Sequence, residues 1–318
     1  MKRIIPFLER LPVVAQLIEM TRHIKIPGFQ GLPLYDVALF FFRGLNKGDI
    51  QMRARSASFS FFLALFPAVI FLFTLIPYIP IDGFQDRLLV LIQALLPANT
   101  YQASYQTIED IIRHQRGGLL SFGFVFALYV STNGVFALLK GFSQTYHARE
   151  SRSPFRLRIA SLVLTLVFAF LIFMVIAMII GSEIAAKYII QKKIMGTRLP
   201  LFLLNTGRWL ILAGLCFTAI SLLYSYGMSR PSRSIRWKFV TAGSTLATIL
   251  VIATSLGFNY FITHFGQFNK IYGSIGTLIV ILSWIFFNVL QLIIGFELNA
   301  SIDMAKRNPR IRKIGSIF

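Results

Sequence analysis

The last hydrophobic run of the chain constrains its fold more than any other feature. Between Lys270 and Glu297 lie 26 residues without a charged side chain, and about 20 apolar residues are enough for a helix to cross the hydrocarbon core of a bilayer. We therefore predict a transmembrane helix over 272–298. At about 100° per residue, its small and amide side chains gather on one side, which indicates that this side packs against other helices.

The composition agrees with an integral membrane protein. Apolar residues make up 56% and charged residues 14% of the 318 positions, which leaves too little polar surface to cover a water-soluble globule of this size. The formal charge of +20 is then explained by basic loops that fix the orientation of the chain and meet anionic lipid, and we expect no nucleic-acid partner. The single cysteine, Cys216, excludes an intrachain disulfide.

Five further stretches are uncharged and long enough to span a membrane. Together with 272–298 they predict an all-α integral membrane fold with six transmembrane helices in one domain over 56–300. The five stretches are 56–81, 117–139, 159–182, 209–229 and 239–263.

The remaining segments are too polar or too short to span. Residues 1–55 contain four prolines and predict a cytoplasmic or interfacial amphipathic segment, with a short interfacial helix over about 34–45. The external loop 82–116 predicts two short amphipathic helices, which either cap a cavity or pack at the interface. Residues 301–318 form a basic cytoplasmic tail.

Basic residues are distributed unevenly between the connecting segments. Counted from the N-terminus, alternate segments hold 23 Lys and Arg residues and the others hold eight, with Arg208 left aside at the mouth of the fourth span. The positive-inside rule therefore places both termini in the cytoplasm, as an even number of spans requires.

Residues that would support catalysis do not group in the sequence. The four histidines are His23, His114, His147 and His264; none lies four residues from another histidine, or near a cysteine or carboxylate that would complete a set of metal ligands. No nucleotide-binding loop or serine-hydrolase elbow is present. We expect no metal site and no cofactor, and we do not expect an enzyme.

One set of polar residues could line a substrate path. Asn133 and Lys140 lie seven residues apart on the second span, and Asn288, Gln291 and Asn299 follow one face of the sixth. Polar groups within spans turn away from lipid, toward other helices or a water-filled cavity. The alternative is that these side chains only hold the bundle together through hydrogen bonds between helices.

Charged residues at the ends of the spans form a second set of candidates. Arg53, Arg55 and Glu297 all lie at the cytoplasmic boundary, where Glu297 could pair with Arg55 or Lys140. Because Glu297 projects onto the apolar side of its helix, the alternative is that it snorkels to the headgroups.

Two further sets of charges are candidates by position. Glu183 and Arg208 lie at the outer ends of their spans and form a candidate pair there, as Arg53, Arg55 and Glu297 do at the cytoplasmic ends. The loop between the fourth and fifth spans could contact anionic headgroups through four cations. These are Arg230, Arg233, Arg236 and Lys238.

Three segments together resemble the BrkB/YihY family of six-helix bacterial membrane proteins. They are Arg53–Pro67, Asn133–Arg152 with its Tyr146, and Tyr272–Gly276 leading through Trp284 to Gly295–Asn299. The resemblance covers about residues 45–305 and implies a location in the bacterial inner membrane. Phe296 stands where the family pattern has alanine, so we expect looser packing around Glu297.

The resemblance leaves several functions open. The family is associated with envelope integrity and virulence, has been proposed to transport or export a substrate, and has carried a ribonuclease label. We predict a transporter or exporter, for example of an anionic lipid or another envelope amphiphile, with membrane lipids as partners. The alternative is a noncatalytic membrane scaffold, and a ribonuclease ranks last, because basic loops alone bind RNA without cleaving it.

Overall fold

The computed structural model describes helices along most of the chain. It describes residues 21, 24, 26, 28–47, 49–78, 83–95, 98–115, 117–145, 153–191, 198–227, 239–265 and 274–307. The elements are α3 (Leu34–Lys47), α4 (Ile50–Leu75), η1 (Ile76–Tyr78), α5 (Phe84–Leu95), α6 (Ala98–Arg113), α7 (Gly117–Ser143), α8 (Pro154–Gln191), α9 (Arg198–Gly227), α10 (Ala242–Phe265) and α12 (Ser274–Arg307).

The prediction of six spanning helices is confirmed. Six helices of the described residues are long and apolar enough to cross a membrane, and each overlaps one of the predicted hydrophobic stretches over most of its length. They are Ile50–Tyr78, Ser121–Ser143, Pro154–Gln191, Leu199–Gly227, Ala242–His264 and Gly276–Lys306.

Several helices extend beyond the uncharged runs that predicted them. α4 begins six residues before 56, so Arg53 and Arg55 belong to the helix, and α12 continues ten residues past Glu297. α8 runs over 38 residues and includes Glu183. Because a charged side chain does not interrupt backbone hydrogen bonding, these helices extend past the apolar run that a bilayer can cover.

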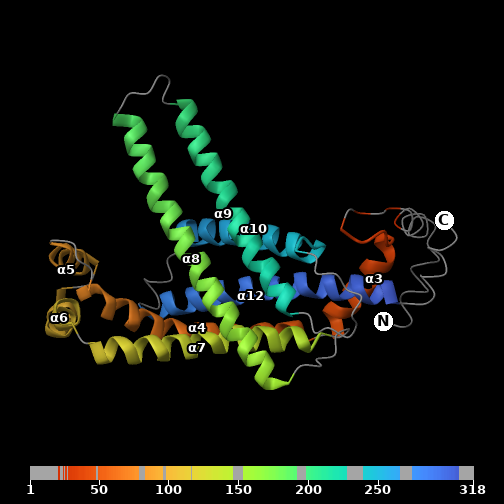
Figure 1. The fold of residues 1–318 in the computed structure, drawn as a ribbon, viewed down its shortest axis with the longest axis horizontal. Helices are drawn as coiled ribbons and strands as arrows, with labels where there is room; N and C mark the ends of the chain where they lie inside the picture. The colour runs from red at the N-terminus through yellow and green to blue at the C-terminus, as the bar shows by residue number, and fades with distance from the viewer. Residues whose placement is uncertain are drawn as a thin grey trace.

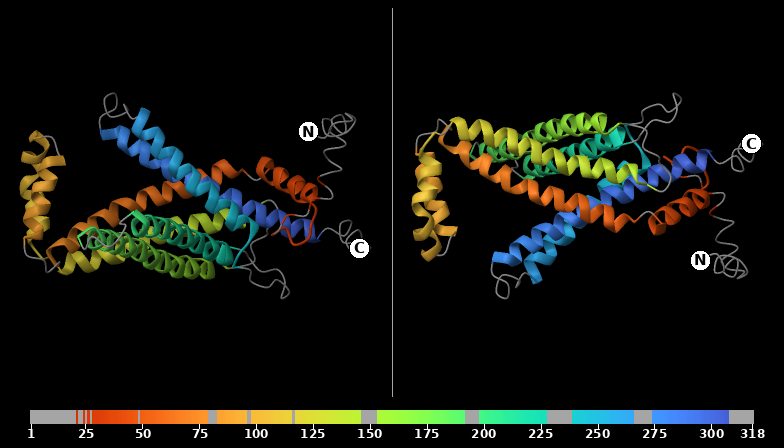
Figure 2. Two further views of the ribbon diagram at one scale, coloured as in Figure 1. Left: turned by 90° about the horizontal axis from the view of Figure 1, so that it is seen from above. Right: turned by 90° about the horizontal axis from the view of Figure 1, so that it is seen from below.

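Two pairs of helices cross to form the centre of the molecule. α4 packs along α7, α10 packs along α12, and α12 crosses α4. Figure 2 shows the α10–α12 pair diverging from α4 and α7 on one side of this crossing. α8 and α9 lie side by side and project at a steep angle to α4, α7 and α12 (Figure 1).

Short amphipathic helices lie at the two ends of the crossing pairs. α5 and α6 form a hairpin across the far end of α4 and α7 (Figure 2), held by a small core of Ile76, Leu89 and Ile112. α3 lies beside the C-terminal part of α12, against a second small core that includes Val37, Leu298 and Ile302. Short helices therefore lie in the segments where the sequence predicts them, 34–45 and 82–116, and α3 places Gly44 beside the main crossing.

The main core lies where α4, α7 and α12 meet. Small residues of α4, Ala54 and Ala57, are fully buried there and let α7 and α12 approach closely. Phe142 of α7, Tyr224 of α9 and Phe296 of α12 fill the space beside them. The charged site described next is embedded in this core.

Candidate functional site

A buried ion pair joins α4 to α12. Nη2 of Arg53 lies 3.2 Å from Oε2 of Glu297, and the two side chains are 3% and 0% exposed. Both residues lie on the helix faces that point into the core, so neither charge contacts solvent or lipid. Isolated charges are costly to bury, so the pair must be held by further partners.

The end of α7 supplies further partners for Arg53. Nη1 of Arg53 donates hydrogen bonds to the carbonyl oxygen of Gly141 at 2.8 Å and to Oγ1 of Thr145 at 3.1 Å. The last four carbonyls of a helix lack partners within the helix and carry a partial negative charge. The guanidinium thus satisfies a free carbonyl of α7 and lies where the helix dipole favours a cation.

α3 closes the site from its fourth side. A Cβ atom placed on Gly44 would lie 2.1 Å from Oε1 and 2.8 Å from Cδ of Glu297. Only a residue without a side chain lets α3 pack directly on the carboxylate. The site therefore connects α3, α4, α7 and α12 through two charged side chains.

Gly44→Ala is expected to destabilise the protein by about 1–3 kcal/mol, the usual cost of overpacking a filled core. The added methyl group must displace either α3 or a carboxylate that Arg53 holds in place. Chemical unfolding in detergent measures the effect. Gly214→Ala on α9, where the methyl group would meet no atom within 4 Å, is the matched control, and equal stability of the two variants would contradict this packing.

Three aromatic rings pack together beside the ion pair. Phe296 stacks on Phe142 with ring centroids 4.1 Å apart, and the Tyr224 ring meets both edge to face. The Tyr224 hydroxyl donates a hydrogen bond to the carbonyl oxygen of Leu292 at 2.7 Å. The expectation that Phe296 loosens the packing around Glu297 is wrong, because the ring is 2% exposed and fills the space between α7, α9 and α12.

α10 and α12 make their closest approach next to this site. A Cβ on Gly243 would lie 2.1 Å from the carbonyl oxygen of Gly295, and one on Gly295 would lie 2.7 Å from Cβ of Ala247. Oδ1 of Asn299 accepts a hydrogen bond from the backbone N–H of Gly243 at 2.8 Å, and its Nδ2 donates to Oγ1 of Thr241 at 2.9 Å. Asn299 thus caps the first turn of α10 by accepting from the Gly243 N–H, a group that has no acceptor within the helix.

The residues of the predicted polar path lie in separate places. Asn133 accepts a hydrogen bond from Nη1 of Arg158 on α8 at 2.6 Å, and Lys140 is exposed. The Asn288 amide donates to the carbonyl of Trp284 on its own helix.

The other amides of α12 contact α10. Gln291 donates to the hydroxyl of Thr254, while Asn299 caps the helix. The structure therefore brings two of the predicted path residues against α10 and leaves Asn133 and Lys140 on α7, apart from them.

The inner charge cluster forms with a different partner from the one expected. Glu297 pairs with Arg53, whereas Arg55 and Lys140, the two partners that the sequence suggested, are exposed. The alternative that Glu297 snorkels to the headgroups is also wrong, because its side chain is 0% exposed. The physical reason is that the apolar side of α12 in this region packs against α3 and α4 rather than lipid.

The remaining sequence candidates are less informative. Glu183 is exposed, and the described residues include no ion pair between it and Arg208, whose Nε is buried without a hydrogen-bond partner. The four cations of the 230–238 loop, Arg230, Arg233, Arg236 and Lys238, lie outside the described residues.

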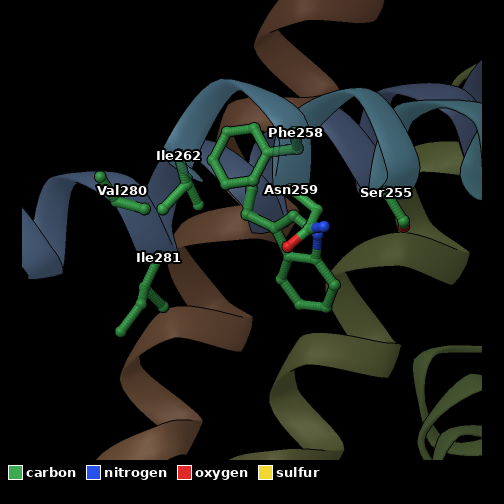
Figure 3. Close-up of a pocket in the computed structure, with 7 residues that line it drawn as sticks. Ser255, Phe258, Asn259, Ile262, Val280 and Ile281 are labelled. Atoms are coloured by element: carbon green, nitrogen blue, oxygen red, sulfur yellow. The ribbon is translucent and has the colours of Figure 1, made fainter. Parts of the chain in front are cut away.

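A groove of about 280 Å³ lies between α10 and α12, beyond Gln291 and away from the close crossing. Its wall is mainly apolar, with one amide and one hydroxyl from α10, as Figure 3 shows. The residues that line it are Ser255, Phe258, Asn259, Ile262, Val280, Ile281 and Trp284. None of the predicted path residues is among them.

Sequence reasoning missed three residues that build these sites. Gly44 and Thr145 lie in segments that carry no periodic polar signal, and their roles depend on which helices meet in space. Arg158 was counted only as a basic residue at the cytoplasmic end of a span, although its guanidinium reaches Asn133 on the neighbouring helix. The sequence signal for Arg158 is its place directly before the uncharged run 159–182, because a helix that begins a few residues earlier includes it, as α8 does.

Comparisons with known proteins agree with this architecture. A family model described as virulence factor BrkB matches residues 41–314. A ribonuclease-like protein of Bacillus subtilis, YfkH, is 29% identical over 266 residues, which cover 83% of this chain and 94% of that protein.

More distant relatives match over shorter stretches. A UPF0761 membrane protein of Tolumonas auensis is 30% identical over 82 residues, 26% of this chain and 27% of that protein. One from Xanthomonas campestris is 26% identical over 121 residues, 36% and 28% of the two chains. The chain therefore matches less than a third of the length of these two relatives, and no solved structure matches it.

Proposed function

We propose that this chain, which belongs to the family of the virulence factor BrkB, moves an anionic lipid or another envelope amphiphile across the bacterial inner membrane. Six apolar helices make it a multi-pass membrane protein. Its formal charge of +20 favours anionic partners at the membrane surface. With both termini in the cytoplasm, most of the basic residues would face the inner leaflet.

The groove between α10 and α12 is the observation that carries this proposal. It lies between two spanning helices, and its lining combines the Phe258 and Trp284 rings with the Asn259 amide. Binding sites for small molecules commonly pair an apolar wall with a few polar groups that fix orientation. An amphiphile fits such a groove, because its chain can lie on the rings while its polar part meets the amide and the hydroxyl of Ser255.

Asn259→Leu is expected to slow the movement of lipid at least about tenfold if the amide contributes a hydrogen bond of about 1.5 kcal/mol at the rate-limiting barrier. The measurement is the movement of fluorescent phosphatidylglycerol between the leaflets of liposomes that contain the purified protein. Asn205→Leu, an exposed amide of α9 outside the groove, is the matched control and should behave like the unaltered protein. Equal rates for the two variants would exclude the groove as the path.

A noncatalytic membrane scaffold is the second candidate, and the polar contacts between helices favour it. Gln291 bonds to α10, Asn299 caps α10, and Arg53 with Glu297 locks four helices together. Polar residues used in this way stabilise a bundle without forming a path. Failure of the purified protein to move any lipid in the liposome assay, while it remains folded, would support the scaffold.

A ribonuclease ranks below both candidates. The ribonuclease-like name belongs to the Bacillus relative, and RNA cleavage needs a positioned acid–base pair or a metal set. In the described ranges, no three His, Cys, Asp or Glu side chains lie close enough to hold a metal ion. Basic surface alone would give this chain affinity for RNA phosphates and no cleavage.

A further inference from the structure

Arg158 brings a positive charge beside the middle of a spanning helix. Its Nη1 donates to Oδ1 of Asn133 at 2.6 Å, and Asn133 lies ten residues before the end of the span Ser121–Ser143. At about 1.5 Å per residue, this contact lies about 15 Å along α7 from that end. A guanidinium remains charged in any protein environment, so the charge cannot be removed by loss of a proton.

The partners that the described residues give Arg158 are all neutral. The guanidinium carbon lies 4.9 Å from the centre of the Tyr129 ring and 5.6 Å from that of Phe136. These rings attract the cation through their faces, and Asn133 accepts one hydrogen bond. No carboxylate within the described ranges pairs with Arg158. In contrast to Arg53, this arginine keeps its net charge and has donors left over.

The side chains around Arg158 are exposed and apolar. Arg158 itself is half-buried, and the Tyr129 ring beside it is 58% exposed. On the same face of α8, one turn before and one turn after Arg158, lie Phe155 and Leu162, whose side chains are also exposed. A ligand that reaches the guanidinium along this face would contact hydrocarbon side chains on both sides.

We propose that Arg158 is a binding site for the phosphate group of a phospholipid, with the acyl chains lying over Phe155 and Leu162. The free nitrogens of a guanidinium match two phosphate oxygens in a paired arrangement, and hydrogen bonds between charged groups are the strong ones. Asn133 fixes the orientation of the guanidinium, and Tyr129 and Phe136 hold its plane. The phosphate supplies the negative charge that the protein does not provide.

This site lies on α7 and α8, outside the groove of α10 and α12. A phosphate-binding site at Arg158 would identify the headgroup chemistry of the amphiphile. Only the claim that the bound lipid is the transported substrate rests on the proposed function. Binding at equilibrium and movement between leaflets are separate measurements. Lipid binding at Arg158 without movement would leave the site intact and refute transport.

The test measures the affinity of detergent-purified protein for short-chain phosphatidylglycerol. The lipid is titrated into the protein, and the shift of the thermal unfolding midpoint reports binding. Arg158→Gln is expected to weaken binding at least tenfold. The affinity of Arg158→Lys should lie between those of the unaltered protein and Arg158→Gln, because lysine keeps the charge and loses the paired geometry. Arg156→Gln, an exposed arginine of the same helix, is the matched control and should bind like the unaltered protein.

One soluble probe and one uncharged lipid probe show whether the site binds a phospholipid, a soluble phosphate or acyl chains alone. Glycerol 3-phosphate carries the phosphate without acyl chains, and a short-chain diacylglycerol carries the chains without phosphate; both should bind at least tenfold more weakly than the phospholipid. Equal binding of glycerol 3-phosphate would make this a site for a soluble anion and overturn the proposal, as would equal binding of the diacylglycerol. An unchanged affinity in Arg158→Gln would also overturn it.

A second variant covers the case in which Arg158→Gln does not fold. Tyr129→Leu changes a ring that is largely exposed, so it should fold, and it removes one wall that holds the guanidinium. We expect phosphatidylglycerol to bind this variant several-fold more weakly. Unaltered affinity would show that the ring and the guanidinium do not form the site.

Discussion

Arg53→Ala and Glu297→Ala are each expected to destabilise the protein by about 3–5 kcal/mol, the cost of leaving one charge of a buried pair without its partner. Both side chains are almost completely buried, so water cannot replace the missing charge. Arg53→Ala also leaves the carbonyl of Gly141 without its donor. Chemical unfolding of the purified variants in detergent measures both effects.

Replacing both partners is expected to cost less than removing either one. Arg53→Met combined with Glu297→Leu leaves no charge in the core and fills a similar volume, and such replacements are often neutral or stabilising. The buried Nε of Arg53 has no hydrogen-bond partner, so the desolvation free energy of this group is not offset in the native protein. Arg55→Ala, two residues along the same helix and exposed, should change stability by less than about 0.5 kcal/mol. A double variant as unstable as the sum of its two single variants would contradict the account.

Gly243→Ala is expected to destabilise the protein by about 3 kcal/mol, at the upper end of the usual cost of overpacking. The new methyl group would meet the carbonyl oxygen of Gly295 at 2.1 Å and Cγ of Asn299 at 2.6 Å. Backbone atoms of a helix cannot turn aside as a flexible side chain can, so α10 and α12 must separate. Separation also breaks the Asn299 cap on the first turn of α10.

The matched control lies on the same helix. A methyl group on Gly257 would meet no atom within 4 Å, so Gly257→Ala should leave the thermal unfolding midpoint unchanged or raise it slightly, because alanine favours a helix over glycine. The comparison separates a packing effect at Gly243 from any general effect of losing a glycine. Equal midpoints for the two variants would show that α10 and α12 do not approach as closely as described.

The spanning helices could be predicted because a helix that crosses a bilayer needs a long apolar run. Every span needs about 20 apolar residues, and most of each predicted run lies within a helix of the structure, as 239–263 does in α10. Gly243 and Ala247 lie four residues apart in the sequence, a spacing of small residues that favours a close helix contact, and both lie at the crossing with Gly295. Length, hydropathy and small-residue spacing are local properties, so the sequence contains them directly.

The partner of Glu297 could not be predicted in the same way. With the first span predicted to begin at 56, Arg53 and Arg55 fall at the end of the interfacial segment, and the sequence does not indicate which of the two faces the core. Since α4 begins at Ile50, the two arginines project about 200° apart on a helix, and only Arg53 faces the core. Tertiary packing decides which face of α4 contacts α12, and a local pattern of charges does not predict it.

The side of α12 that carries Glu297 led to a second wrong interpretation. An apolar helix face can contact either lipid or protein, because both environments are equally apolar. The snorkelling alternative assumed lipid, whereas the structure places α3 and α4 there. Gly44 would have been the decisive clue, but a single glycine in an amphipathic segment has many explanations until its neighbour is known.

The measurement that tests the central claim most directly is the rate at which the unaltered protein moves phosphatidylglycerol between the leaflets of sealed liposomes. Movement is expected to exceed that of protein-free liposomes by at least about tenfold, which corresponds to a barrier lower by about 1.4 kcal/mol. The rate is also expected to scale with the amount of folded protein. Equal rates with and without the protein, in the presence and absence of a proton gradient, would contradict transport of this lipid and favour the scaffold.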